Sequence, residues 1–421
     1  MYPQSRSLWS GSFCGARELW YNQLRMTENG IRRRVAAFIK KESVLCIAMV
    51  CALVSLFVAD WTPGDLNGYI KWKTLCVLAS LMMVVAGFKE NGVFDQAAAK
   101  LTRSSRRSTG FNGANFLVLS LVLLPFFAAM IITNDVALLT FVPLGLYTLE
   151  RVNMSNLAIR VTILQAIAAN LGSMLTPFGN PHNLECFIHY DIPVKDFFGT
   201  TLMFFILSLA LLTLASIIVA HNAVADAIVY EVGSSSMKAA GGEHEPVKTL
   251  NIVYSILALI ALLTVFNVIP WYAVSMAVIA LTILVVDRKL YAKVDWCLLL
   301  TFVCFFIFSG NLSSIDAVRD SIEKLTEKNT FITGALTSQV ISNVPATILL
   351  EPFTNDWRAL MIGTDVGGLG TPIASMANLI AIKAYMKQKD SKPGRFMAEF
   401  LIIEFVFFAI YVGYSGLIGL Y

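Results

Sequence analysis

Charge is scarce in this sequence, and its scarcity excludes a water-soluble fold. Only 14% of the 421 residues are charged, while 57% are hydrophobic; a soluble domain carries about 25% charged residues. Long apolar runs alternate with short segments that contain most of the lysine and arginine. This alternation is typical of a chain that crosses a membrane repeatedly.

Signatures of metal sites, of common enzymes and of nucleic-acid binding are missing too. The seven cysteines show no C-x-x-C or cysteine–histidine ligand spacing, and most lie in apolar runs, where cysteine packs as a small side chain. The absence of a Walker A sequence argues against ATP hydrolysis as the energy source. No nucleophile–histidine–acid constellation is present, so we expect no enzyme activity, and no cofactor beyond a coupling Na⁺ or H⁺. The net charge of +4 is spread between apolar runs, whereas nucleic-acid binding needs a basic patch on a polar domain.

Seven apolar runs are long enough, with their polar flanks, to cross a bilayer. They are Val44–Val58, Thr74–Gly87, Phe197–Ala220, Leu250–Phe266, Trp271–Val286, Trp296–Phe308 and Phe400–Leu420. Some of these runs are shorter than the roughly 20 residues that a full span needs. Their flanking residues would complete the crossing.

Two further pairs of apolar segments are joined by only three or four residues. Residues 133–135 join Asn115–Ile132 to Val136–Leu149, and residues 342–345 join Phe331–Ile341 to Ala346–Phe353. So short a link cannot connect two full spans without exposing bare backbone to lipid, which is tolerated only inside protein or a water-filled cavity. We therefore expect two re-entrant hairpins with buried tips. Two ordinary helices with a tight surface turn are the alternative.

Two other segments have the pattern of helices that break halfway. Leu157–Leu171 runs into residues 172–180, rich in glycine and proline, and resumes at Pro181. Trp357–Ile362 runs into residues 363–375 and resumes at Met376. Glycine and proline at this density do not hold a helix. Interrupted hydrophobic segments at corresponding positions of two halves point to the binding site of a transporter.

The interruptions match between the two halves of the chain, residue by residue. Ile132-Thr133-Asn134, Ala137 and Pro143 match Ile341-Ser342-Asn343, Ala346 and Pro352 at one constant offset. Gly172, Thr176-Pro177 and Asn183-Leu184 match Gly367, Thr371-Pro372 and Asn378-Leu379 at another, and Gly179-Asn180 matches Ala374-Ser375 as a small residue before a polar one. The sequence therefore predicts an all-α polytopic membrane protein built as an inverted repeat with two re-entrant hairpins and two broken helices.

The expected organisation has four parts. A cytoplasmic arm (1–43) precedes the first transmembrane repeat (44–220), and a flexible cytoplasmic linker (221–249), rich in glycine and serine, leads to the second repeat (250–421). Placing the N-terminus in the cytoplasm puts the positive segments Lys89–Arg107, Arg288–Lys293 and Lys383–Arg395 on the same side. Seven runs and two broken helices make nine spans, so we expect an extracytoplasmic C-terminus in the cell (inner) membrane.

Four helices restart at the interruptions and would point their N-termini at the protein centre. Asn134, Asn180, Asn343 and Ser375 can cap them. Their free N–H groups and partial positive charge suit an anion, while unwound carbonyls suit Na⁺. The alternative is that these residues only cap helices. The expected substrate-binding residues are Thr133, Asn134, Thr176, Pro177, Gly179, Asn180, Asn183, Ser342, Asn343, Thr371, Pro372, Ser375 and Asn378.

Asp135 and Asp365 are the expected ligands of the coupling ion, because a carboxylate at membrane depth is costly and so is functional by default. Simple capping of the following half-helix is the alternative for Asp135. Weaker candidates are Glu185, Glu351 and Glu404. His182 could titrate near neutral pH, but a packing or capping role is favoured for it.

The two interruption motifs resemble those of the ion transporter superfamily. They read NLGSMLTPFGNPHNL at residues 170–184 and GTDVGGLGTPIASMANL at residues 363–379. Within the superfamily, the chain is most similar to arsenite efflux permeases and NhaD-type sodium/proton antiporters, with citrate transporters close by and divalent anion/sodium symporters more distant. The resemblance extends from Val44 to the C-terminus. It implies a scaffold domain, a moving transport domain, an elevator-like motion and a homodimer.

One departure from the symporters bears on the substrate. Symporters carry Ser-Asn-Thr at both hairpin tips, whereas here the tips read Thr133-Asn134-Asp135 and Ser342-Asn343-Val344. The aspartate after the first asparagine, with Asp365, looks more like the arsenite permease pattern. We expect an ion-coupled secondary transporter of a small anion or oxyanion. The alternatives are a Na⁺/H⁺ antiporter that carries no anion, and a channel or sensor with a transporter fold.

Overall fold

The protein was analysed as a computed structural model that describes residues 42–59, 61–93, 111–151, 154–224 and 247–420. The expected cytoplasmic arm and linker lie almost wholly outside the described residues, as does most of the positive segment after Lys89. Within the described residues every regular element is a helix and there is no strand. The predicted all-α class is therefore confirmed.

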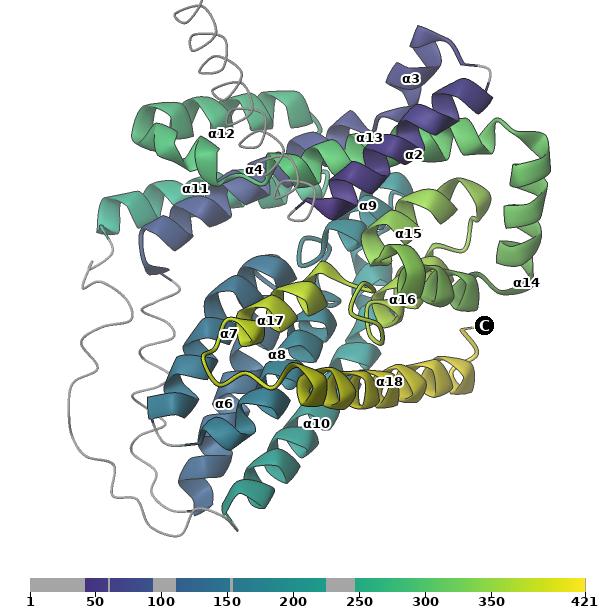
Figure 1. The fold of residues 1–421 in the computed structure, drawn as a ribbon. Coiled ribbons are helices and arrows are strands. Elements are labelled where there is room, and N and C mark those ends of the chain that lie inside the picture. The colour runs from purple at the N-terminus through teal and green to yellow at the C-terminus, as the bar shows by residue number, and fades with distance from the viewer. Residues whose placement is uncertain (1–41, 60, 94–110, 152–153, 225–246, 421) are drawn as a thin grey trace, which may run out of the picture.

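Six helices form the upper layer in Figure 1. They are α2 (Ser43–Val58), α3 (Pro63–Tyr69), α4 (Trp72–Glu90), α11 (Lys248–Val265), α12 (Tyr272–Asp287) and α13 (Trp296–Ser313). In this layer α13 packs on α2, and α4 packs on α11 and α12; the 3₁₀ turn η2 (Arg288–Lys293) links α12 to α13. Five of the seven predicted apolar runs lie here.

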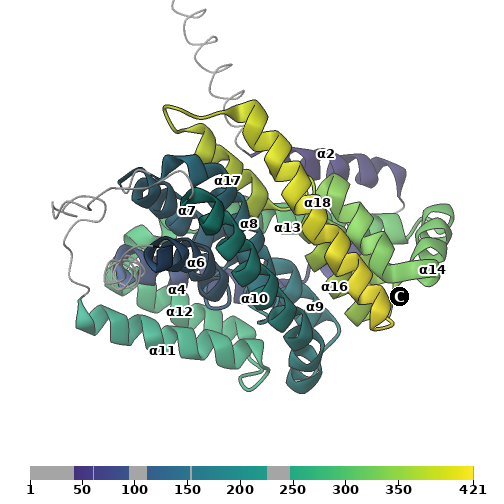
Figure 2. The ribbon, with the colours of Figure 1, turned by 90° about the horizontal axis from the view of Figure 1, so that it is seen from below.

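The lower layer is built around the two interrupted helices. The first interruption separates α8 (Ala158–Ser173) from α9 (Pro181–His189), and the second separates α16 (Trp357–Gly367) from α17 (Met376–Met386). Around them lie η1 (Ser155–Leu157), α6 (Phe111–Ala128), α7 (Asn134–Arg151), α10 (Val194–Val224), α14 (Asp316–Ile341), α15 (Asn343–Leu350), η3 (Glu351–Phe353) and α18 (Pro393–Leu417). Figure 2 shows α10 and α18 crossing the outer face of this layer. Contacts of α8 with α6, α7, α10, α17 and α18 make it the centre of the layer.

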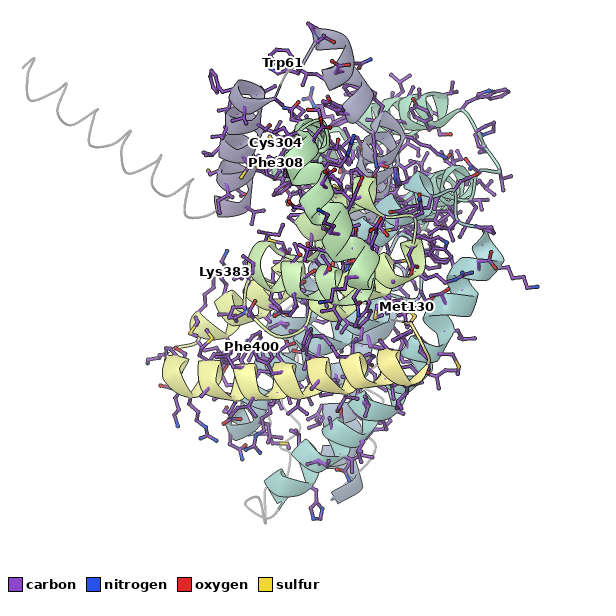
Figure 3. The ribbon with its side chains drawn as sticks, turned by 90° about the vertical axis from the view of Figure 1, so that its right-hand side faces the viewer. Trp61, Met130, Cys304, Phe308, Lys383 and Phe400 are labelled. Atoms are coloured by element: carbon purple, nitrogen blue, oxygen red, sulfur yellow. The ribbon has the colours of Figure 1, made fainter. Side chains whose placement is uncertain are left out.

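The pattern of burial is that of a protein surrounded by lipid. Five helices are long and apolar enough to cross a membrane by length and composition: α4, α10, α11, α13 and α18. Large apolar side chains are exposed along α10, namely Leu202, Met203, Ile206, Leu214, Ile217 and Ile218. Glutamate, aspartate and histidine side chains are buried instead (Glu185, Asp365 and His182 are 0–3% exposed). In Figure 3, Phe400 marks α18 across the lower layer, and Cys304 and Phe308 mark α13 in the upper layer. The protein is thus a multi-pass membrane protein, while the nine-span topology stays a prediction.

The first predicted break is confirmed, and the second begins later than predicted. The helix α9 starts at Pro181 as predicted, and α8 ends at Ser173, two residues after the predicted end at Leu171. The expectation that the second break starts at Gly363 is wrong, because α16 continues to Gly367. Cβ atoms added at Gly363 and Gly367 would lie 2.5 Å from the Phe331 carbonyl oxygen and 2.6 Å from Ser338 Cβ. These glycines therefore let α16 approach α14 closely instead of interrupting the helix.

The polar stretch before the second hairpin is also helical. Most of residues 313–328 belongs to α14 (Asp316–Ile341), which changes direction at Asn329 (φ −167°, ψ 94°). The Asn329 side chain accepts a hydrogen bond from the Ile332 amide at 2.8 Å and so caps the part of the helix that follows. The change of direction lets a polar helix and a buried hairpin arm follow one another without a loop.

We expect Gly172→Ala to destabilise the protein, because a Cβ there would lie 2.1 Å from the carbonyl oxygen of Phe126, where α8 crosses α6. Overpacking of this kind costs about 1–3 kcal/mol. Thermal unfolding of the detergent-solubilised protein measures the loss. The control is Gly199→Ala in α10, where nothing lies within 4 Å and alanine favours the helix by up to about 1 kcal/mol. Equal unfolding temperatures for the two variants would contradict the close packing.

Candidate functional site

Backbone hydrogen bonds join each hairpin tip to a helix break, and they recur in both halves. The amide of Asn134, at the start of α7, donates to the Gly179 carbonyl in the first break at 3.1 Å. The amide of Asn343, at the start of α15, donates to the Ala374 carbonyl in the second break at 2.9 Å. Asn134 matches Asn343 and Gly179 matches Ala374 in the sequence repeat, so the same contact is made twice.

The threonine of each Thr-Pro pair makes a second recurring contact. Thr176 Oγ1 donates to the Met130 carbonyl at 2.7 Å, and Thr371 Oγ1 donates to the Gln339 carbonyl at 2.8 Å. Both acceptors lie at the end of the first arm of the neighbouring hairpin. The Gln339 side chain also donates to the Gly367 carbonyl at 2.8 Å. Unwound backbone in the breaks thus finds partners within the protein, as buried peptide groups must.

A cavity of about 60 Å³ lies where the tips and breaks meet. Six predicted site residues line it: Asn134, Asp135, Asn180, Ser342, Asn343 and Ser375. The side facing the upper layer is lined by Glu42, Val44, Leu45, Asp295, Cys297, Leu298 and Thr301, at the starts of α2 and α13. One water needs about 10–15 Å³, so the cavity has room for an ion with a few waters. It is smaller than the sites of about 300 Å³ or more that hold larger organic ligands.

The other predicted site residues lie around this cavity without lining it. They are Thr133, Thr176, Pro177, Gly179, Asn183, Asp365, Thr371, Pro372 and Asn378. Several of them hold the breaks and hairpins together through the contacts above. The structure therefore brings the predicted residues into one region, where some line the cavity and the others support those that do. Contact of these residues with a solute stays a prediction.

Asn170 connects the first hairpin tip and both interrupted helices, although the sequence interpretation did not select it. Its Oδ1 accepts hydrogen bonds from Asn134 Nδ2 at 3.2 Å and from Ser375 Oγ at 2.9 Å. Its Nδ2 donates to Asn378 Oδ1 at 3.1 Å. The offset that matches Gly172 with Gly367 also matches Asn170 with Asp365, and this signal in the sequence could have found it.

Asp365 lies buried in the last turns of α16 and faces the first interrupted helix. Its Oδ1 lies 3.0 Å from His182 Nε2 and 3.4 Å from Asn183 Nδ2. The Asp365–Asn183 contact matches the Asn170–Asn378 contact, so the two interrupted helices are linked crosswise. His182 is thus a direct partner of Asp365, beyond the packing or capping role that the sequence favoured. A histidine–carboxylate pair without lipid contact can hold or release a proton.

Asp135 is the half-buried carboxylate of the cavity itself. It lies in the first turn of α7, and its Oδ1 has no hydrogen-bond partner among the described residues. The backbone amide of Asp135 is satisfied by Asn134 Oδ1 at 2.9 Å. An available carboxylate oxygen beside a helix N-terminus is a reasonable ligand for a cation that enters the cavity.

Glu404, a weaker candidate, reaches the second break from α18. It is fully buried, and its Oε2 accepts a hydrogen bond from the Gly370 amide at 3.3 Å. Gly370 adopts φ +110°, a conformation that favours glycine. Glu404 therefore supports the unwound segment of the second break.

Known proteins similar to this chain show its family. Residues 35–356 match the sequence profile of the citrate transporter family. The chain belongs to this family. Its membership confirms the resemblance to the ion transporter superfamily and shows a membrane transporter of the citrate transporter type.

Individual relatives extend the similarity over most of the chain. The uncharacterized transporter MJ0456 of Methanocaldococcus jannaschii is 29% identical over 84% of this chain and 92% of its own length. The inner membrane protein YbiR of Escherichia coli is 32% identical over 78% of this chain and 83% of its own length. The putative transporter arsB of Dictyostelium discoideum is 23% identical over 40% of this chain and 28% of its own length. The matches to MJ0456 and YbiR thus cover most of both chains.

We expect Asn170→Ala to lower stability by about 3 kcal/mol, because it leaves the buried groups of Asn134, Ser375 and Asn378 short of a partner, and an unsatisfied buried polar group costs about 1–3 kcal/mol. Thermal or denaturant unfolding measures the loss. Asn156→Ala, at an exposed asparagine of η1, is the control and should change stability by less than about 0.5 kcal/mol. A variant as stable as this control would show that Asn170 does not hold the segments together.

Proposed function

We propose that this member of the citrate transporter family is an ion-coupled secondary transporter of a small anion rich in oxygen, either an organic carboxylate or an arsenite-like oxyanion. The observation that carries this proposal is the convergence of four helix starts on one cavity. Residues at the starts of α7, α9, α15 and α17 line it, namely Asn134, Pro181, Asn343 and Met376. Helix N-termini present free N–H groups and partial positive charge to an anion.

The charges of the cavity support coupling to a cation. Asp135 and Asp295 place two carboxylates in its lining, and the described lining residues include no lysine, arginine or histidine. An anion entering beside these groups would be repelled unless a cation came with it. We therefore propose that Na⁺ or H⁺ binds at Asp135, and that the buried Asp365 with His182 supports this site from behind.

The position of the cavity supports an elevator-like motion. One side of its wall comes from α2 and α13 of the upper layer, and the other comes from the hairpin tips and breaks of the lower layer. We propose that the upper layer is a fixed scaffold. The lower layer would move past it together with the hairpin tips and helix breaks that line the cavity. The matched contacts of the two halves favour an inverted repeat, in which the hairpins enter from opposite sides. A homodimer with a cytoplasmic N-terminus and an extracytoplasmic C-terminus belongs to the same proposal.

The acidic lining also favours a second candidate function, Na⁺/H⁺ antiport without an anion. In that case Asp135 and Asp365 would bind Na⁺ and H⁺ competitively. The cavity volume of about 60 Å³ suits a partly hydrated cation better than citrate in this conformation.

Proteoliposomes distinguish the two functions. Uptake of labelled citrate or arsenite that depends on a Na⁺ or pH gradient supports the first. Dye-reported Na⁺/H⁺ exchange that needs no added anion, in vesicles that take up no anion, supports the second. Ion current without saturation or coupling would overturn both and indicate a channel.

We expect Asp135→Asn and Asp365→Asn each to reduce coupled transport about tenfold or more, which corresponds to about 1.4 kcal/mol of lost cation binding. Both changes keep the side-chain shape and remove the charge. Initial rates of gradient-driven uptake at equal amounts of reconstituted protein measure the effect. The control is Asp196→Asn, at an exposed aspartate in the first turn of α10. Wild-type rates in Asp135→Asn would remove this residue from the mechanism.

A further inference from the structure

A second group of buried charges lies apart from the cavity, where the upper layer meets α9 and η3. Glu185 on α9 and Glu351 in η3 are 0% and 3% exposed. Between them lies the ammonium of Lys71, the residue that precedes α4. Its Nζ lies 3.1 Å from Glu185 Oε1, forms an ion pair with Glu351 Oε1 and contacts His189 Nδ1 at 2.8 Å.

The three charges do not balance. Two carboxylates face one ammonium, which leaves one negative charge in excess. The second oxygens, Glu185 Oε2 and Glu351 Oε2, are buried and have no hydrogen-bond partner among the described residues. Two neighbouring carboxylates cannot both stay ionised away from water unless cations neutralise them. The unpartnered oxygens and the excess negative charge together indicate that the Glu185–Glu351 pair binds one more cation in addition to Lys71.

Among the described residues, Lys71 supplies the full positive charge that faces the pair. Burial alone would lower the pKa of Lys71, but the charges of Glu351 and Glu185 outweigh it and raise that pKa, so the ammonium stays charged at neutral pH. Other titratable groups near the pair are Cys186 and His189 on α9 and Tyr190 just after α9; Cys186 and Tyr190 in turn interact with Asp365 of α16 and with Asp356 before it, respectively. Of these only His189 could become positive, and it already contacts Lys71.

The two carboxylates belong to one layer and the ammonium to the other. Tyr190, next to the end of α9, donates its hydroxyl to the carbonyls of Glu351 and Thr354 at 3.1 and 3.0 Å. This contact fastens η3 to α9, so Glu185 and Glu351 move together. Lys71 packs over the ring of Phe306 of α13 at 5.8 Å and stays with the upper layer. Any sliding of the layers at this point separates the ammonium from the carboxylates.

We propose that Glu185 and Glu351 form a proton-binding pair, in which one proton balances the carboxylates beside Lys71 and a second replaces Lys71 when the layers separate. A proton needs no ligand beyond the carboxylate that it neutralises. Glu185, His189 and Glu351 also bring ligand atoms within 4.8 Å of one another, so a metal ion held by these three residues is the occupant that the test below distinguishes from a proton. This inference rests on the layer motion of the proposed function. The site would make that motion take up protons at a place apart from the cavity.

Charge-balance variants test the pair through stability, without any transport assay, so a failure here is distinct from a failure of the proposed transport. The glutamates of the unfolded chain titrate near pH 4.3 and are therefore ionised at neutral pH. Each extra proton that only the folded protein holds lowers the folding equilibrium constant about tenfold for each unit by which the pH rises. The unfolding temperature is followed from about pH 5.5 to about pH 8.

The proposal fixes the order of the pH dependence. Lys71→Met leaves two carboxylates without a cation and should become destabilised more steeply with rising pH than the wild type. Glu351→Gln leaves one carboxylate with Lys71 and should be less steep than the wild type. The double variant Lys71→Met/Glu351→Gln leaves one carboxylate alone and should return to the wild-type slope. Lys73→Met is the matched control, since the exposed Lys73 bonds to Asn267 at 2.8 Å and not to the pair.

Three results would overturn the proposal. The first is an identical pH slope for Lys71→Met and Lys73→Met. The second is stabilisation of Lys71→Met by Na⁺ at constant pH with no effect of pH, because the cation would then not be a proton. The third applies if Lys71→Met does not fold: adding Glu351→Gln should restore the folded yield, and a double variant with no better yield contradicts the charge balance.

Discussion

Buried backbone must find a hydrogen-bond partner inside a protein that lipid surrounds, and the rest of this structure depends on how that constraint is met. Two helices are interrupted, and each interruption exposes peptide groups far from water. The hairpin tips supply partners: the Asn134 amide for the Gly179 carbonyl, and the Asn343 amide for the Ala374 carbonyl. Neither a hairpin nor a break would be stable alone, because each leaves polar groups that only the other satisfies. The cavity lies where the hairpin tips and the helix breaks face one another, so its position follows from the same need for hydrogen-bond partners.

The sequence predicts the helices well because their ends coincide with changes from apolar to polar residues. It places the first break within two residues, although Gly172 lies inside α8 and lets that helix approach Phe126 of α6. At the second break it fails by several residues, since Gly363 and Gly367 let α16 approach Phe331 and Ser338 of α14. A glycine that permits close packing and a glycine that interrupts a helix look the same in a sequence. Only the neighbouring helix, about thirty residues away in the chain, distinguishes them.

The site could be predicted in outline but not in its connections. Asn134, Asn180, Asn343 and Ser375 follow from helix-start chemistry and line the cavity, whereas Asn170 and His182 sit within apolar or ordinary helical contexts. What gives them importance is a partner in the other half of the chain, as in the contact of His182 with Asp365. Comparing matched positions assigns His182 to Ala377 and so suggests no role. The structure instead joins a residue of one half to a non-matching residue of the other half. A comparison of matched positions in the repeat does not reveal the partners in such contacts.

The distribution of buried charge argues for cation coupling whatever the substrate is. Carboxylates line the cavity at the boundary of the layers, and Glu185 with Glu351 meets Lys71 at the same boundary. Charges buried within one layer would move with it and keep their partners. Charges at the boundary change partners whenever the layers slide, and in surroundings of low dielectric constant an unpaired carboxylate is costly enough to draw in a cation. In the proposed mechanism, a motion between these layers would therefore be tied to cation binding by electrostatics, and the proposed anion site would need only to bias which position of the layers is favoured.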